Sequence, residues 1–121
     1  MYKITFMGAG STIFAKNVIG DTMCCEPFHD AEFALYDIDS DRLEESYIMI
    51  DALNRSINGG KAKITKHLGI PERKNALAGA DFVVNAIQVG GYEPCTVIDF
   101  EIPKKYGIRQ TIGDTLGIGG I

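Results

Sequence analysis

The sequence predicts an α/β fold, a Rossmann-type parallel sheet with helices on both faces. Short apolar runs alternate with longer segments of helical periodicity, the first run ends in Gly8-Ala9-Gly10, and the second ends in the acids Asp37 and Asp39. This alternation favours right-handed crossover connections, which make the strands parallel and bring their carboxyl ends to one edge. Ligands of such sheets bind at that edge.

Length and charge restrict the classes of protein. The 121 residues suit one domain, and 45% of them are hydrophobic, which is enough for an ordinary core. A net charge of −4 disfavours a nucleic-acid partner. The sequence has no apolar run long enough for a membrane span or a signal peptide, so we expect a cytoplasmic protein.

The first apolar run, Lys3–Met7, predicts a strand that ends in Gly8 and Gly10. A Gly-x-Gly turn lets backbone N–H groups and the positive end of a helix dipole approach a pyrophosphate, so it indicates a dinucleotide site. The full motif has a third small residue where Ile13 stands. By itself, therefore, the motif also fits an ordinary tight turn.

The segment after this turn, Thr12–Met23, predicts a helix capped by Ser11, with apolar or small side chains at helical spacing at Ala15, Val18, Ile19 and Thr22. A second strand, Glu32–Tyr36, leads into Asp37. An acid at this position accepts hydrogen bonds from the adenosine ribose and repels a 2′-phosphate, which favours NAD over NADP. In the alternative interpretation Asp37 only caps the next helix, a role that we expect of Asp39 or Ser40 in any case.

The next helix is predicted from one apolar stripe, which comprises Leu43, Tyr47, Ile50, Leu53 and Ile57. Alternation in Ala62–Leu68 then predicts a half-exposed third strand. We expect its His67 to be solvated, because no acid or thiol is close to it in the sequence. Pro71 begins a short helix that extends to Ala78.

The last part of the chain predicts a fourth strand, a helix and a loop. Asp81–Ile87 is almost continuously apolar, which is typical of a strand buried on both faces of a parallel sheet. Tyr92–Tyr106 predicts a helix with a kink at Pro103. The glycine-rich segment Gln110–Ile121 contains a single acid, Asp114, and we interpret it as a ligand-facing loop, with a flexible terminus as the alternative.

The three cysteines are expected to be reduced. Cys24 and Cys25 are adjacent, which disfavours a disulfide between them, and Cys95 has no evident partner. A metal site formed by Cys24, Cys25 and His29 would match no standard zinc spacing. We therefore interpret the adjacent pair as small buried hydrophobic residues at a helix end.

Taken together, five segments resemble the N-terminal part of glycoside hydrolase family 4, and most closely its bacterial α-galactosidases (melibiases). These segments are Lys3–Thr12, Tyr36–Asp39, Asn85–Tyr92, Ile102–Gly107 and Asp114–Gly120. The resemblance extends over essentially the whole chain. It implies that residues 1–121 are an incomplete NAD-binding Rossmann-like domain, from which the metal-binding and substrate-binding C-terminal region is absent, so we expect the chain alone to be inactive.

The resemblance implies an uncommon hydrolytic mechanism that requires NAD and a divalent metal, usually Mn²⁺. In this family, hydride is taken to be removed from sugar C3, which acidifies the proton on C2. A base removes that proton while the metal polarises the oxygens, and the C1–O bond breaks by elimination. Water then adds, and the hydride returns to C3.

Individual residues carry over from the family motifs. The phosphate-binding turn corresponds to Gly8, Gly10, Ser11 and Thr12, and the ribose acid corresponds to Asp37. The nicotinamide side corresponds to Asn85, Ile87 and Gln88. Asp114 matches a family acid that is thought to raise the basicity of the catalytic base. The base and the metal ligands are expected beyond residue 121.

The substrate implied is a small glycoside. Family members that act on 6-phosphoglycosides carry arginines about where Gln88 and Cys95 stand, so we expect an unphosphorylated α-glycoside, with an α-galactoside favoured. The full-length protein is expected to be a homo-oligomer. Two alternatives stay open: an NAD-dependent 2-hydroxy-acid dehydrogenase of the lactate and malate type, and an isolated NAD-binding module without activity.

Overall fold

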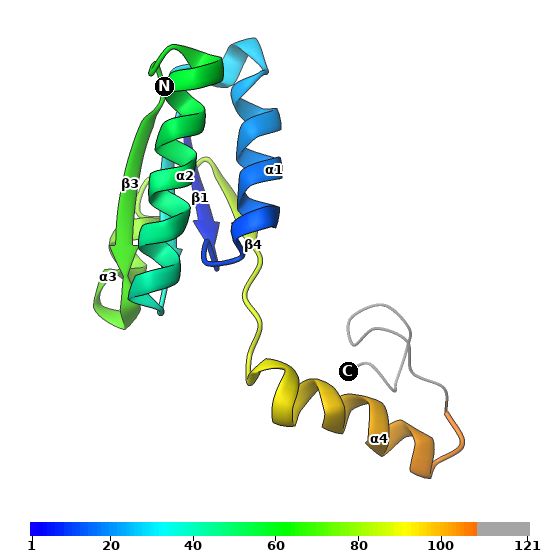
Figure 1. Cartoon of the computed structure of the whole chain (residues 1–121). Helices are drawn as coiled ribbons and strands as arrows, with labels where there is room; N and C mark the ends of the chain where they lie inside the picture. The colour runs from blue at the N-terminus through cyan, green and yellow to red at the C-terminus, as the bar shows by residue number, and fades with distance from the viewer. Residues whose placement is uncertain (109–121) are drawn as a thin grey trace. The chain divides into compact units, whose positions relative to one another are not determined.

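The computed structural model describes residues 1–108 (Figure 1). The backbone forms two compact units, one of residues 1–87 and one that begins at Gln88. The first unit contains β1 (Lys3–Met7), α1 (Thr12–Met23), η1 (Glu26–Phe28), β2 (Glu32–Asp37), α2 (Ser40–Asn58), β3 (Lys63–Leu68), α3 (Gly69–Leu77) and β4 (Phe82–Asn85). The second contains η2 (Gly91–Thr96) and α4 (Val97–Lys105).

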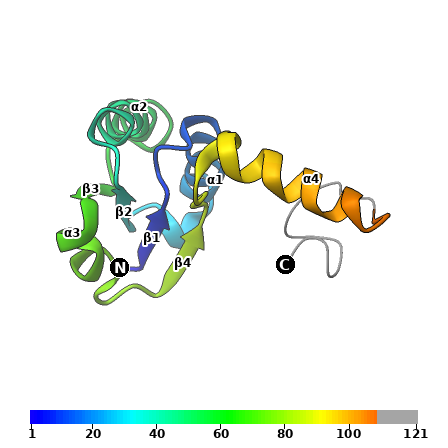
Figure 2. The ribbon, with the colours of Figure 1, turned by 90° about the horizontal axis from the view of Figure 1, so that it is seen from below.

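The four strands form one parallel sheet in the order β3-β2-β1-β4. Helices α1 and α2 lie on one face and α3 lies on the other (Figure 2). This arrangement confirms the predicted Rossmann-type sheet with helices on both faces. The central strands β1 and β2 are buried almost throughout, as expected where both faces are covered.

The core lies between the sheet and the α1–α2 layer. Phe6, Phe33 and Leu35 of the sheet pack with Ile19 of α1 and Ile50 of α2, and each of these side chains is at most 1% exposed. On the opposite face, the Thr5 hydroxyl donates to the carbonyl of Ala76 in α3 at 2.7 Å. The buried hydroxyl is therefore satisfied, which removes the cost of burying it.

Helix α1 has the predicted bounds, but its start differs from the prediction. Ser11 stands at the N-cap position and makes no capping hydrogen bond with its side chain. Ile13, the bulky residue where the motif has a small one, is 74% exposed, so it does not hold the helix away from the sheet. Gly20 is buried instead, and a Cβ there would lie 2.9 Å from Leu53 Cδ2 of α2.

Helix α2 is capped by Asp39, as predicted, because its carboxylate accepts from the backbone N–H groups of residues 41 and 42. The predicted apolar stripe is only partly correct. Leu43 and Ile50 are buried, whereas Ile57 is 49% exposed, and the buried positions include Ser46, Asn54 and Asn58. These polar side chains can be buried because each bonds to the backbone, for example from Asn54 Nδ2 to the carbonyl of Ala62 at 2.8 Å.

The prediction that the fourth strand is buried on both faces is wrong. Within residues 1–108, β4 is one of the two edge strands and pairs only with β1. Phe82 is 49% exposed and Val83 is 52% exposed. An apolar run shows that a strand suits burial, but the order of the strands determines whether it is buried.

The third strand is half exposed, as predicted, but His67 is less solvated than expected. Its Nδ1 lies 3.4 Å from Glu72 Oε2, and its Nε2 lies 3.2 Å from Thr65 Oγ1. The acid is five residues away in the sequence, and the turn into α3 (Figure 1) brings it back toward the strand. The side chain is consequently only 15% exposed.

Two further expectations are changed by the structure. Cys24 and Cys25 are exposed rather than buried, because they follow Met23, the last buried residue of α1. In the second unit, the helical backbone is interrupted at Glu93, inside η2, rather than at Pro103, where a kink was expected. Helix α4 continues past Pro103 and ends at Lys105. No helix among residues 1–108 combines the length and the apolar character needed to cross a membrane.

Candidate functional site

The carboxyl ends of β1, β2 and β4 meet at one edge of the sheet. Met7, the last residue of β1, lies opposite Tyr36 of β2 and opposite Asn85 of β4. The β1–α1 turn begins at this edge, at the tip of the β1 arrow in Figure 1. The prediction that these strand ends lie together is confirmed.

Gly8, the first residue of the turn, is required by its own backbone and by the neighbouring strand. Its φ is +87°, in the region that favours glycine. A Cβ here would lie 2.6 Å from the carbonyl oxygen of Ala86 and 2.9 Å from the nitrogen of Ile87. Any side chain would therefore push β1 and β4 apart where they leave the sheet.

Gly10 is required by the next strand on the other side. A Cβ at this position would lie 2.7 Å from Asp37 Oδ2 and 2.9 Å from Arg42 Cβ. Because glycine has no Cβ, the Gly10 N–H can approach Asp37 and donates to its Oδ2 at 2.7 Å. The second glycine of the motif thus allows close contact between the turn and the acid that follows β2.

Asp37 is half buried, and both of its carboxylate oxygens are in use. Oδ2 accepts from Gly10, and Oδ1 accepts from the Asp39 N–H at 3.0 Å. A carboxylate oxygen can accept about two hydrogen bonds, so each retains capacity for one more. These two bonds fix the orientation of the carboxylate and leave it able to accept from hydroxyl groups.

The backbone N–H groups of the turn already donate hydrogen bonds to the protein, which the motif alone does not indicate. The N–H groups of Gly8 and Ala9 both donate to the carbonyl of Tyr36 at 2.9 Å. Because Gly10 donates to Asp37, three consecutive amides are bonded to the end of β2. These amides hold the turn in shape and are not free to meet a ligand.

The free amides lie one turn further along, at the start of α1. The N–H groups of Ser11 and Thr12 bond within the turn, to the carbonyls of Gly8 and Gly10. Among residues 1–108, no protein acceptor bonds to the N–H groups of Ile13 and Phe14, as expected for the first turn of a helix. They stand at the positive end of the α1 dipole.

Ser46, which the sequence reasoning missed, fixes the same turn from α2. Its hydroxyl donates to the carbonyl of Ala9 at 2.6 Å, and the residue is fully buried. The signal was present in the sequence, because Ser46 follows Leu43 by three residues and precedes Ile50 by four. This spacing places all three on one face of a helix.

The remaining predicted residues differ in location. Asn85 and Ile87 are both exposed. Asn85 pairs with Met7, the backbone nitrogen of Ile87 lies beside Gly8, and the Ile87 N–H is 3.4 Å from Asn85 Oδ1. Gln88 belongs to the second unit, where its Nε2 donates to Thr96 Oγ1 at 3.1 Å. Asp114 lies outside the described residues.

Metal ligands were expected beyond residue 121. Among residues 1–108, the structure contains no group of three His, Cys, Asp or Glu side chains arranged to hold a metal. The described part of the edge therefore presents backbone amides and a carboxylate, a combination that suits a ligand with both phosphate and hydroxyl groups.

The four-stranded parallel sheet and its glycine turn place the chain in the Rossmann-like class of α/β domains. Residues 3–121 match the family model described as family 4 glycosyl hydrolase. The chain therefore belongs to this glycosidase family, which confirms the resemblance drawn from the motifs.

Curated relatives and solved structures agree with this assignment. Over its whole length the chain is 60% identical to an alpha-galactosidase of Bacillus subtilis (strain 168), and the match covers 27% of that protein. It is 35% identical to an alpha-galactosidase of Rhizobium meliloti (strain 1021), in a match that covers 99% of this chain and 24% of that protein. The chain thus spans about a quarter of the length of these relatives.

Two solved structures of 6-phospho-alpha-glucosidases from gut microorganisms share the fold. One, in complex with NAD and glucose-6-phosphate, has a TM-score of 0.72 and 26% identity, and the match covers 98% of this chain and 25% of that one. The other, in complex with NAD and Mn²⁺, has a TM-score of 0.67 and 22% identity, and the match covers 98% of this chain and 26% of that one. The second similarity concerns the fold alone.

Proposed function

We propose that the chain forms the NAD-binding part of an NAD- and divalent-metal-dependent glycosidase that hydrolyses an unphosphorylated α-glycoside, with an α-galactoside favoured. Family membership supports the glycosidase class, and the 60% identical relative supports the choice of sugar. The observation that carries the proposal is the corner where Gly10 meets the carboxylate of Asp37.

The residues of this corner fit NAD. Because Gly10 carries no Cβ, the start of α1 can lie close to the end of β2. The unpaired N–H groups of Ile13 and Phe14 suit a diphosphate, and the lone pairs that remain on Asp37 suit the two ribose hydroxyls. A 2′-phosphate would meet the carboxylate directly, which favours NAD over NADP.

The chain's own residues would act by holding and orienting the cofactor. The first turn of α1 would bind the diphosphate together with Ser11 and Thr12, Asp37 would bind the adenosine ribose, and Asn85 with Ile87 would line the nicotinamide side. When bound, NAD supplies a reversible hydride acceptor for C3 of the sugar, and oxidation there makes the C2 proton acidic enough for elimination at C1. The roles proposed for Gln88, on the nicotinamide side, and for Asp114, beside the base, rest on the family resemblance alone.

Two parts of the proposal concern residues outside this corner. The metal requirement is taken from the family resemblance, with its ligands expected beyond residue 121. A lactate- or malate-type dehydrogenase is disfavoured by the family assignment. An NAD-binding module without activity remains the alternative for the chain alone, because the chain spans about a quarter of its relatives.

Calorimetric titration of the chain with NAD⁺ and NADP⁺ tests cofactor binding. We expect NAD⁺ to bind more tightly than NADP⁺, and we expect Asp37→Ala to weaken NAD⁺ binding at least tenfold. Asp41→Ala is the matched control, because it removes the same charge from an exposed carboxylate in the first turn of α2. If NAD⁺ does not bind, or if both variants weaken it equally, the assignment of Asp37 is wrong.

Hydrolysis of melibiose and of p-nitrophenyl α-galactoside tests the activity. A protein that carries this chain and the remaining length of the family should hydrolyse both substrates when NAD⁺ and Mn²⁺ are present. The chain alone should not. Turnover by the chain alone would contradict the expectation that base and metal ligands lie elsewhere, and a preference for 6-phosphosugars would contradict the proposed substrate class.

A further inference from the structure

The Cβ of Arg42 lies directly beside the proposed ribose site. It lies in the first turn of α2, after the Asp39 cap, and its Cβ is one of two groups that would contact a Cβ at Gly10. The other is Asp37 Oδ2. Three groups therefore lie together at this corner: the Gly10 peptide, the Asp37 carboxylate and the Cβ of Arg42.

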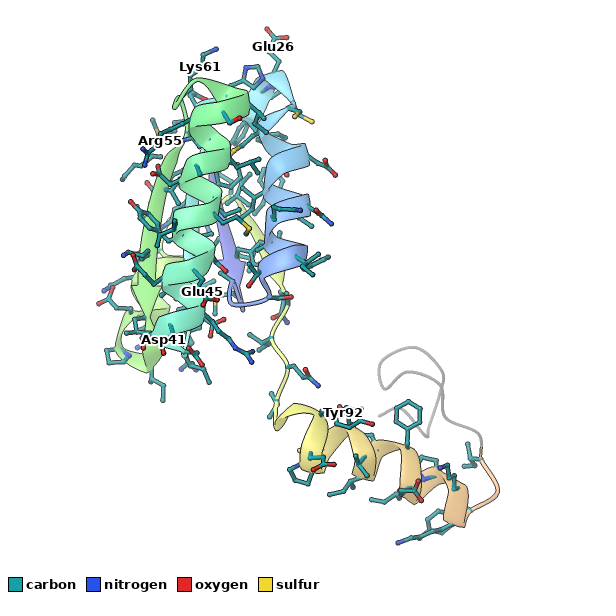
Figure 3. The ribbon with its side chains drawn as sticks, viewed as in Figure 1. Glu26, Asp41, Glu45, Arg55, Lys61 and Tyr92 are labelled. Carbon is teal, nitrogen blue, oxygen red and sulfur yellow. The ribbon has the colours of Figure 1, made fainter. Side chains whose placement is uncertain are left out.

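Within residues 1–108, the guanidinium of Arg42 makes no hydrogen bond with the protein and can bind a ligand. Its nearest carboxylate is that of Asp39, with Nε and Oδ2 4.0 Å apart, and the side chain is 70% exposed. An exposed pair at this separation contributes little. Arg55, in the same helix, is instead paired with Asp51 one turn earlier. Arg55 lies at the opposite end of α2 from Asp41, and so from this corner (Figure 3).

We propose that Arg42 is a further cofactor-binding residue whose guanidinium stacks on the adenine of NAD. This inference rests on the proposed function, because Asp37 must hold the ribose to which adenine is attached. A planar guanidinium stacks well on an aromatic face and gains from the cation–π attraction. The chain thereby recognises the base as well as the sugar and the diphosphate.

The charges around Arg42 favour the neutral base over a 2′-phosphate as its partner. The Asp39 carboxylate lies 4.0 Å from Arg42 Nε, Asp37 lies at the same corner, and Asp41 is in the same first turn of α2, so the residues around this cation carry three acids. A phosphate bound there would meet net negative charge, whereas adenine carries none. Arg42 is accordingly assigned to the adenine of NAD and not to an NADP phosphate.

Fluorescence titration with NADH, and calorimetric titration with AMP and with nicotinamide mononucleotide, test this assignment on the chain itself. Arg42→Ala should weaken the binding of NADH and AMP by about three- to tenfold, as expected for loss of one cation–π contact. Nicotinamide mononucleotide, which has no adenine, should bind equally to both forms. Arg42→Lys should give an intermediate loss, and Arg55→Ala should give none.

The other outcomes separate the two proposals. If the unaltered chain binds none of these ligands, the proposed function fails. If it binds NADH and Arg42→Ala changes that affinity less than twofold, only the role of Arg42 fails. Equal weakening of nicotinamide mononucleotide, or an effect on NADP⁺ alone, would also overturn adenine stacking, and urea unfolding of each variant would show whether lost affinity reflects lost fold.

Discussion

The N–H of Gly10 and the carboxylate of Asp37 are joined by a 2.7 Å hydrogen bond between residues 27 positions apart in the sequence. The bond connects the turn after β1 to the end of β2. The carboxylate that is proposed to bind the cofactor therefore also helps to hold the turn in shape. Structural and binding roles of Asp37 can be separated, because unfolding and NAD titration measure them independently.

Removing the Asp37 carboxylate should destabilise the chain as well as weaken NAD binding. Asp37→Ala leaves the N–H groups of Gly10 and Asp39 without their charged acceptor, so we expect a loss of about 1.5–3 kcal/mol. Urea unfolding at pH 7 measures the change. Asp37→Asn keeps one acceptor oxygen and should lose less, and an unchanged midpoint for Asp37→Ala would show that the bond has no structural role.

Gly10→Ala should be strongly unfavourable. The new Cβ would lie 2.7 Å from Asp37 Oδ2 and 2.9 Å from Arg42 Cβ, so the turn or the start of α2 must shift. We expect a destabilisation of about 1–3 kcal/mol together with loss of NAD binding. Gly20→Ala is the matched control, because its new Cβ would meet only the end of the flexible Leu53 side chain and alanine favours a helix. Equal effects of the two substitutions would contradict this account.

Ser46→Ala should loosen the turn from the α2 side. The substitution leaves the buried carbonyl of Ala9 without the hydroxyl that now donates to it, at an expected loss of about 1–3 kcal/mol. Ser56, exposed on the same helix, provides the control, and Ser56→Ala should change the unfolding free energy by less than about 0.5 kcal/mol. Hydrogen exchange at Gly10 should increase only in Ser46→Ala.

Glu32 should give the chain a measurable acid sensitivity. Its hydrogen bond with Lys63 and the nearby charge of Lys3 hold the pKa of this carboxyl below its ordinary value of 4.5 in the folded state. Because the folded pKa is lowered, the stabilisation is present above pH 4.5 and disappears as the pH falls through the folded value.

Glu32→Gln tests this dependence. We expect the variant to be less stable than the unaltered chain by about 0.5 kcal/mol at pH 7, and the difference to vanish in strong acid. Urea unfolding at several pH values measures it. A difference that persists below the folded pKa would show that packing, rather than charge, is responsible.

The exposed edge strand β4 should make the isolated chain associate. Phe82 and Val83 are about half exposed on an edge strand, a combination that favours pairing with other chains. Light scattering should show a mass that rises with concentration, and Val83→Lys should reduce it. Ile48→Lys, at a position 60% exposed on α2, should have no such effect. A monomer at all concentrations would contradict this prediction.

The sequence alone determined the order of elements and the position of the turn. Strand and helix periodicities are local, so they predicted β1, α1 and most of α2 with nearly correct bounds. The sequence also placed Gly8, Gly10 and Asp37 at one end of the sheet, because a parallel α/β sheet brings the ends of its strands to one edge. The cofactor-binding roles proposed for them follow from residue type and place in the topology.

The tertiary structure alone decided which partners these groups have. The Gly8 amide donates to Tyr36, Arg42 lies beside Gly10, and the Ser46 hydroxyl donates to Ala9. Each of these contacts joins segments that are far apart in the chain. The exposure of β4 likewise depends on strand order rather than on its apolar composition. Local periodicity records which face a residue can bury, but only the packing of whole elements fixes what that face meets.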